Sequence, residues 1–223
     1  SELNRAVDTM TRGVEGLEQL EKVDTLLAES MAYRDFRAPG KIKDDNELLS
    51  QSAESSETID RILEELVNAE ARFDESGNWS QQVAMLVEEW QTLKSTDSYQ
   101  GNIDPQFKYY QEFVQKVRAL LSATIEISGL GQDASRENLL LLGLLRESLP
   151  DARSIIGRAR TFGTFALIDG QVGYNLSDAL NEIYDELTNR ASLLGPALTV
   201  SMDASPNLEK TTGDAVGGIL ESL

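Results

Sequence analysis

The sequence contains no cysteine and no histidine among its 223 residues. The lack of cysteine excludes disulfides, thiolate zinc sites and cysteine nucleophiles. The lack of histidine excludes Ser/His/Asp triads, histidine general bases and histidine metal ligands. Basic residues are also scarce: 20 Lys and Arg stand against 38 Asp and Glu, which gives a formal charge of −18. Because phosphates are bound by clusters of Lys and Arg, we expect no nucleic-acid partner.

These absences leave little chemistry for an enzyme. Only a metal site made of carboxylates, or a mechanism with two carboxylates, is still open. Helical bundles that hold metal pairs use Glu-x-x-His ligands, which this chain cannot supply. The acidic runs at 44–47 and 88–89 lack the loop spacing of a calcium-binding motif, so they are interpreted as solvated faces. We therefore expect no catalysis, no metal and no cofactor.

Long apolar runs are also missing. No stretch of about 18 apolar residues could span a membrane within this chain, and no signal peptide opens it. Aromatic residues make up only 6% of the chain, which is typical of helical bundles, while 40% of residues are hydrophobic and suffice for a packed core. The alternation of apolar and polar residues that marks a strand occurs nowhere.

Helical spacing of apolar residues runs through almost the whole sequence. The first helix has a 4-3-4-3 seam like that of a coiled coil or bundle, formed by Leu3, Val7, Met10, Val14 and Leu17. We expect Pro39-Gly40 to end this helix.

The other helices are expected at about 45–73, 83–93, 105–127, 134–168 and from 175 onward. Asp104-Pro105 is interpreted as the N-cap and first residue of the fourth. Pro150 should kink the fifth, and Pro196 and Pro206 should bend or interrupt the last.

Six helices of unequal length predict an all-α fold. Two four-helix bundles stacked end to end, which share the long helices, would accommodate all six. We therefore expect an elongated six-helix rod, with residues 1–223 forming one helical domain of two stacked modules.

Short motifs between residues 107 and 167 give a more specific expectation. They are Ser128-x-Leu130-x-x-Asp133, Leu149-Pro150 and Gly157-x-x-Arg160-x-x-Gly163. With this helix order, the chain resembles the periplasmic sensor domains of bacterial methyl-accepting chemotaxis receptors, of the helical bimodular and nitrate-sensor-like type. The first helix departs from the pattern, since it has Tyr33-Arg34-Asp35 where that family often has His-Arg-Gly.

The resemblance implies a ligand-binding sensor domain on the periplasmic side of an inner membrane. Such domains sit between two transmembrane helices, which would lie outside this chain, and they pair into homodimers. They bind small anions such as organic acids and pass a small helix displacement across the membrane. Both ends of the chain lie in apparent helices, which agrees with this placement.

The candidate ligand-binding residues follow from this resemblance and from helical geometry. At ~1.5 Å per residue, Arg34, Tyr109, Tyr110 and Arg160 should lie at similar heights along the rod. Arginine offers a planar fork that matches a carboxylate, and tyrosine offers a hydroxyl. The predicted set is Arg160, Arg34, Tyr33, Arg37, Tyr109, Tyr110 and Thr161.

Each of these residues also has a structural interpretation. Arg160 could form an ion pair with one of the many acidic residues, and Arg34 and Arg37 would be favoured near a helix C-terminus by the helix dipole. The tyrosines could be half-buried packing residues. Arg158 is expected in solvent and Trp90 in the core.

A second function is also compatible with the sequence. A structural or adaptor bundle that serves as a dimerisation spacer would bind no small molecule. The interior distinguishes the two: a sensor should have a polar cavity lined by Arg or Tyr, whereas a spacer should have a dry interior lined by leucine.

Overall fold

The computed structural model describes residues 2–131 and 136–204, and every regular element in them is a helix. The elements are α1 (Glu2–Lys43), α2 (Asn46–Val67), α3 (Asn78–Thr96), α4 (Ile103–Ile127), α5 (Arg136–Gly143), the π-helical segment η1 (Leu144–Ser148), α6 (Leu149–Asp169) and α7 (Tyr174–Ala204). Since α5, η1 and α6 follow one another directly, the described residues form six helical runs. The all-α prediction is confirmed.

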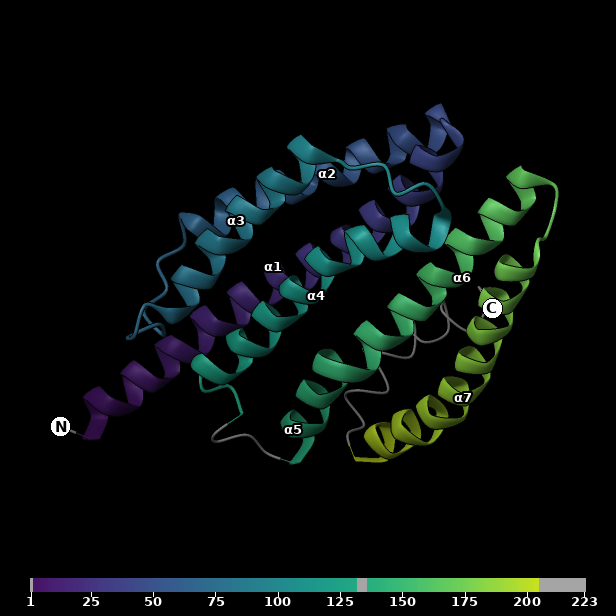
Figure 1. Cartoon of the computed structure of the whole chain (residues 1–223). Coiled ribbons are helices and arrows are strands. Elements are labelled where there is room, and N and C mark those ends of the chain that lie inside the picture. Colours follow the sequence, from purple (N-terminus) through teal and green to yellow (C-terminus); the bar gives the residue numbers. More distant parts are fainter. Residues whose placement is uncertain (1, 132–135, 205–223) are drawn as a thin grey trace.

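Helices α1 and α4 form the centre of the molecule (Figure 1). Helices α2 and α3 lie on one side of them, and α6 and α7 lie on the other. Helix α1 packs against α2, α4 and α6, whereas α7 packs mainly against α6. These contacts are compatible with two bundles that share long helices.

The core follows the apolar faces that helical spacing predicts. Trp90 is fully buried, as expected, and its indole Nε1 donates to Asp60 Oδ1 at 2.7 Å. The ring of Tyr33 packs edge-on against Trp90, with centroids 4.9 Å apart. The predicted faces of α2 and α4 are also buried, through Ile59, Ile62, Leu63, Leu66, Phe107, Val114, Val117 and Leu121.

The expected seam at the start of α1 is wrong as a description of packing within one chain. Met10, Val14 and Leu17 are 74%, 61% and 55% exposed. The face of α1 that enters the core begins instead at Gly16 and Leu20. Leu20 is buried, and Gly16 lies so close to the residue after α4 that a Cβ there would be only 2.4 Å from the Cβ of Ser128. The stripe therefore has no partner among the described residues.

Pro39-Gly40 does not end α1, which continues to Lys43. Proline fixes a φ that suits a helix, and its missing N–H leaves only the carbonyl four residues earlier without a donor. That carbonyl belongs to Asp35, and Thr161 of α6 supplies a donor: its Oγ1 lies 3.2 Å from the Asp35 oxygen. The single hydroxyl proton is shared with the Gly157 carbonyl, 2.9 Å away.

Several boundaries differ from the expected ones. Helix α2 ends at Val67, not near 73, and α4 is capped by Asn102, whose side chain accepts from the N–H of Ile103 at 2.7 Å. A kink was expected at Pro150; the structure has the π-helical segment η1 ending at Ser148, two residues before this proline, and α6 beginning at Leu149. Helix α7 includes Pro196, while Pro206 lies outside the described residues.

Candidate functional site

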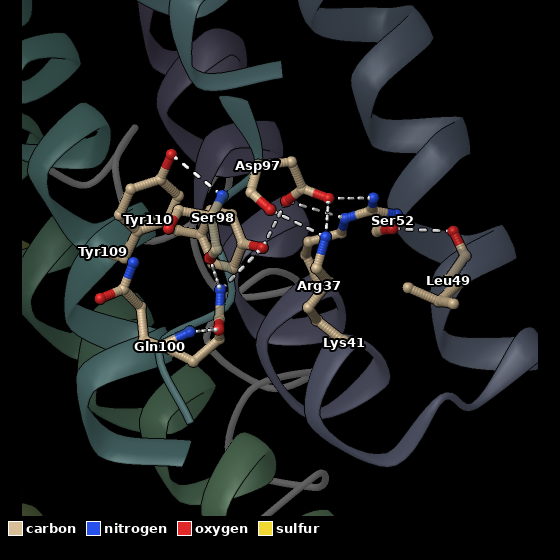
Figure 2. Close-up of polar contacts among 10 residues, drawn as sticks. Arg37, Lys41, Leu49, Ser52, Asp97, Ser98, Gln100, Tyr109 and Tyr110 are labelled. Atoms are coloured by element: carbon tan, nitrogen blue, oxygen red, sulfur yellow. Dashed lines mark hydrogen bonds and ion pairs between the residues drawn. The ribbon is translucent and has the colours of Figure 1, made fainter. Parts of the chain in front are cut away.

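The first polar cluster lies where the end of α1 meets the α3–α4 connection, and Asp97 is its centre. Arg37 Nη2 donates to Asp97 Oδ2 at 2.6 Å. Lys41 Nζ donates to the same oxygen and to the Asp97 carbonyl, the latter at 2.8 Å. The Tyr110 hydroxyl donates to Oδ1 at 2.7 Å (Figure 2). The chain's own donors therefore occupy both carboxylate oxygens.

Side chains of α4 bind the α3–α4 connection just after Asp97 (Figure 2). The Tyr109 hydroxyl accepts from the N–H of Ser98 at 3.3 Å. Gln106 Nε2 donates to the Ser98 carbonyl and to the Tyr110 hydroxyl, both at 3.0 Å. Gln106 Oε1 accepts from the N–H of Gln100 at 2.8 Å. This cluster fastens a loop between two helices.

Electrostatics in the first cluster agree with a structural role. Burial favours protonation of Asp97, but hydrogen bonds from Arg37, Lys41 and Tyr110 outweigh it and hold the pKa of Asp97 below its ordinary value. Burial raises the pKa of Tyr33 to about 12, and burial together with the bond to Asp97 raises the pKa of Tyr110 further. At neutral pH the carboxylate is charged and the phenols are neutral.

The second polar cluster is an ion pair buried between α1 and α6. The side chain of Arg34 has no exposed surface, and its Nε donates to Asp35 Oδ1 at 2.8 Å. The guanidinium stacks over the Phe107 ring, 4.3 Å from the centroid. Arg160 of α6, half exposed, donates to the other carboxylate oxygen of Asp35 at 3.3 Å. Arg34 and Arg160 thus meet at one protein carboxylate.

Gly157 allows α6 to approach this pair. A Cβ at this position would lie 2.0 Å from Asp35 Oδ2 and 3.0 Å from Arg34 Nη2. The Asp35 side chain is only 2% exposed, so it has little room to move away. Any side chain larger than hydrogen would therefore force the ion pair and α6 apart.

Burial dominates the electrostatics of this second cluster. It raises the pKa of Asp35 against the opposing effect of Arg34 and Arg160, and it lowers the pKa of Arg34. Arg34 Nη1 donates to Gln111 and lies 3.4 Å from the Ser154 hydroxyl. Nη2 lies 2.7 Å from Asp35 Oδ1, but its N–H groups make no hydrogen bond. The cluster is charge-paired but incompletely hydrogen-bonded.

A groove of about 350 Å³ lies between α4, α6 and α7, beside these partners of Arg34. Phe107, Gln111 and Ser154, which all contact Arg34, also line the groove. Its basic side chains are Lys108, Arg118, Arg158 and Arg190, and its acidic ones are Asp104, Asp151 and Glu186. Its formal charge is therefore +1, in a chain whose total is −18.

The ion pairs in this groove differ in how tightly they hold their arginines. Asp151 is bound by Arg118 at 2.6 Å and by Arg190 at 2.8 Å. Arg158 has only longer contacts, with acids of α7 that are at least half exposed: Glu182 at 3.4 Å and Glu186 at 3.5 Å. Exposed pairs of this kind contribute little, so Arg158 is the cation that a ligand could recruit most easily.

The structure divides the seven predicted site residues between the two clusters. Arg34, Arg160 and Thr161 surround Asp35, and Tyr33, Arg37, Tyr109 and Tyr110 surround or adjoin Asp97. None of the seven lines the groove.

The arginines that do line the groove were missed from the sequence. Arg158 was expected in solvent, which is wrong, since its side chain is only 24% exposed. The signal that could have found it is the helical stripe of Asp151, Ser154, Ile155 and Arg158, which places four groove residues on one face of α6.

Other features bear on the class of protein. Residues 2–131 and 136–204 contain no group of acidic side chains arranged to hold a metal ion. In the same residues no helix is both long and apolar enough to cross a membrane. Comparison with protein-family models, curated proteins and solved structures finds no match for the chain.

Proposed function

We propose that the chain is the ligand-binding sensor domain of a transmembrane chemoreceptor and that it binds a small anion such as an organic acid. The family resemblance of residues 107–167 suggests the class of protein. The observation that carries the proposal is the groove between α4, α6 and α7, whose formal charge is positive in a strongly acidic chain. An anion is repelled by the rest of this surface and finds arginines together here.

The groove contains groups that can bind a carboxylate. Arg158 can turn its planar guanidinium from two distant glutamates toward a ligand and form the paired bonds that arginine makes with carboxylates. Gln111 and Ser154 provide neutral polar groups in the wall. The buried charge of Arg34 lies directly behind them, within hydrogen-bond distance of both.

In this proposal, helix α6 transmits ligand binding to α1. One face of α6 lines the groove with Ser154 and Arg158, and another contacts α1 through Gly157 and Thr161. A ligand that shifts α6 by ~1–2 Å would therefore move the Asp35 region of α1. Helix α1 is continuous over 42 residues, about 63 Å, and would carry the shift toward an inner membrane, with the domain on the periplasmic side.

The alternative, a dimerisation spacer without a small-molecule ligand, is favoured by one observation. The exposed apolar stripe of Met10, Val14 and Leu17 suits a helix that pairs with another helix. A homodimer is also part of the receptor proposal, so self-association does not separate the two functions. Ligand binding does.

The test is a thermal-unfolding screen against succinate, citrate, sulfate and phosphate, followed by calorimetric titration of any hit. An anion at 100 times its dissociation constant adds about 2.7 kcal/mol to stability. In a domain of this size that raises Tm by roughly 5–10 °C.

Arg158→Gln should weaken the binding of that anion by roughly tenfold. The matched control is Arg153→Gln, on the same helix, because Arg153 pairs with Asp24 at 2.8 Å and does not line the groove. The control should bind like the parent protein. If no anion raises Tm, or if the two variants lose affinity equally, this site is rejected and the spacer is favoured.

A further inference from the structure

Gln111 of α4 contacts the buried Arg34 and also borders the groove between α4, α6 and α7. It is half-buried, it lines the groove, and its Oε1 accepts from Arg34 Nη1. Arginine carries five N–H donors and no acceptor, so only the oxygen end of the amide can face it. The NH2 end of Gln111 therefore points away from Arg34, and no described residue accepts a hydrogen bond from it. Its two N–H groups are available to a ligand in the groove.

Ser154 repeats this arrangement from α6. Its Oγ lies 3.4 Å from the same Nη1 of Arg34, and it also lines the groove. Because Arg34 can only donate, the serine oxygen accepts, and no described residue accepts the serine proton. The Arg34 side chain has no exposed surface, so it does not reach a ligand itself. It acts as a positioning residue that fixes the orientation of neutral donors on two helices.

Arg158 adds a charged donor to this pair. It lies one helical turn after Ser154, so the two side chains are neighbours on one face of α6. Arg158, Ser154 and Gln111 all line the same groove. We propose, on the basis of the anion site proposed above, that these three residues bind a carboxylate group, with Arg158 on one oxygen and Gln111 and Ser154 on the other.

The charges of the groove favour a carboxylate over other ligands. Its remaining cations are already paired: Asp151 binds Arg118 and Arg190, and Asp104 binds Lys108 at 2.6 Å. One carboxylate group cancels the formal charge of +1, whereas sulfate places two negative charges on one centre and exceeds it. An ammonium group would meet only donors on this wall and would be repelled.

The experiment is calorimetric titration of the whole chain with succinate and with sulfate, and succinate should bind more tightly. Gln111→Glu replaces the NH2 group by an oxygen at nearly constant shape. The groove then loses a donor and gains a repelling charge, so succinate affinity should fall roughly thirtyfold or more. Gln115→Glu is the matched control, because Gln115 lies one turn further along α4 and lines the same groove. The same change of charge there should weaken binding only roughly threefold to fivefold.

Two further measurements separate ligand binding from a structural role of Gln111. Gln111→Glu gives Arg34 a carboxylate in place of an amide oxygen and should raise Tm by roughly 2–4 °C, so its loss of affinity would not come from unfolding. In the parent protein, the side-chain N–H signals of Gln111 in NMR spectra are assigned by their absence in Gln111→Glu. They should shift when succinate is added, whereas a structural role alone would leave them in place.

Three results would overturn this proposal and leave the anion site of Arg158 standing. They are equal losses of succinate affinity for Gln111→Glu and Gln115→Glu, tighter binding of sulfate than of succinate, and unshifted Gln111 signals in the saturated succinate complex. A fall in Tm for Gln111→Glu would also overturn it, since Arg34 would then not face this side chain. If no anion binds at all, both proposals fail together.

Discussion

The two polar clusters near the C-terminus of α1 contain the same residue types but differ in their roles. Arg34 and Arg37 are three residues apart, and each meets an aspartate. Asp97 receives donors from three side chains and its pKa is lowered, whereas burial raises the pKa of Asp35. A satisfied carboxylate fastens a loop. The Arg34–Asp35 pair is buried, incompletely hydrogen-bonded and next to a groove. The charge of a ligand in that groove would therefore have a larger electrostatic effect on this pair than on Asp97.

The largest expected effect tests how far Asp35 depends on its arginine. Arg34→Met leaves Asp35 buried without its main partner and should lower the free energy of unfolding by about 3–5 kcal/mol. Arg37→Met should cost about 1–2 kcal/mol, because Lys41 and Tyr110 still bind Asp97. Urea denaturation of both variants measures the difference.

The matching control for Arg34→Met removes the second charge as well. Arg34→Met with Asp35→Leu should recover much of the loss, since apolar residues often replace a buried ion pair without penalty. Equal losses for Arg34→Met and Arg37→Met would contradict the contrast between the clusters.

The second prediction concerns pH. The raised pKa of Asp35 makes its contribution to stability complete below about pH 3.9, the unfolded value, and lost as pH rises through the folded pKa. The lowered pKa of Asp97 makes its contribution complete above about pH 3.9 and lost as pH falls through the folded pKa.

The two Asn variants should therefore diverge as the solution is acidified from pH 7 to pH 3. Relative to the parent, Asp97→Asn should lose less stability and Asp35→Asn should lose more, by on the order of 1 kcal/mol each. Urea unfolding at several pH values gives both slopes. Slopes of the same sign would show that the two carboxylates are not in opposite environments.

The smallest predicted effect separates the two neighbouring tyrosines of the Asp97 cluster. Tyr110→Phe removes a bond to a charged carboxylate and a bond from Gln106, so it should lower stability by about 1.5 kcal/mol. Tyr109→Phe removes one long bond from a backbone N–H and should cost about 0.5 kcal/mol or less. Thermal unfolding compares them, and a larger loss for Tyr109→Phe would mean that the loop, not Asp97, is the centre of the cluster.

Helical spacing predicted the buried faces of α2, α3 and α4 well, because it depends only on the neighbours of each residue along the chain, but it failed at the start of α1. Ile59, Trp90 and Val114 are buried where the pattern placed them. Pro39 shows the limit of such local rules: it ends an isolated helix, but here a side chain from α6 supplies a donor for the carbonyl that it frees. The donor, Thr161, is 126 residues from Asp35 in sequence, and no local pattern contains it.

The candidate site shows the same limit. Convergence of Arg34 and Arg160 was expected from helix lengths, yet the carboxylate between them is Asp35, the neighbour of Arg34 in sequence. Arg158 is two residues from Arg160 and faces another helix, because a rotation of 100° per residue sends the two side chains to opposite sides of α6. Which side borders a groove is decided by where α7 packs, and the sequence alone does not place α7.

The Thr161 hydroxyl contacts the Asp35 carbonyl that Pro39 leaves without its helical donor. The continuity of α1 at this proline therefore depends on the position of α6. While Thr161 stays in place, the interrupted ladder of α1 is bridged and the helix can continue past the proline. If a ligand shifted α6 as proposed, the Asp35 carbonyl would lose this donor and turn outward toward water, and helices bend at a proline when such a carbonyl tilts away. A displacement of α6 along α1 would then become a change of angle within α1.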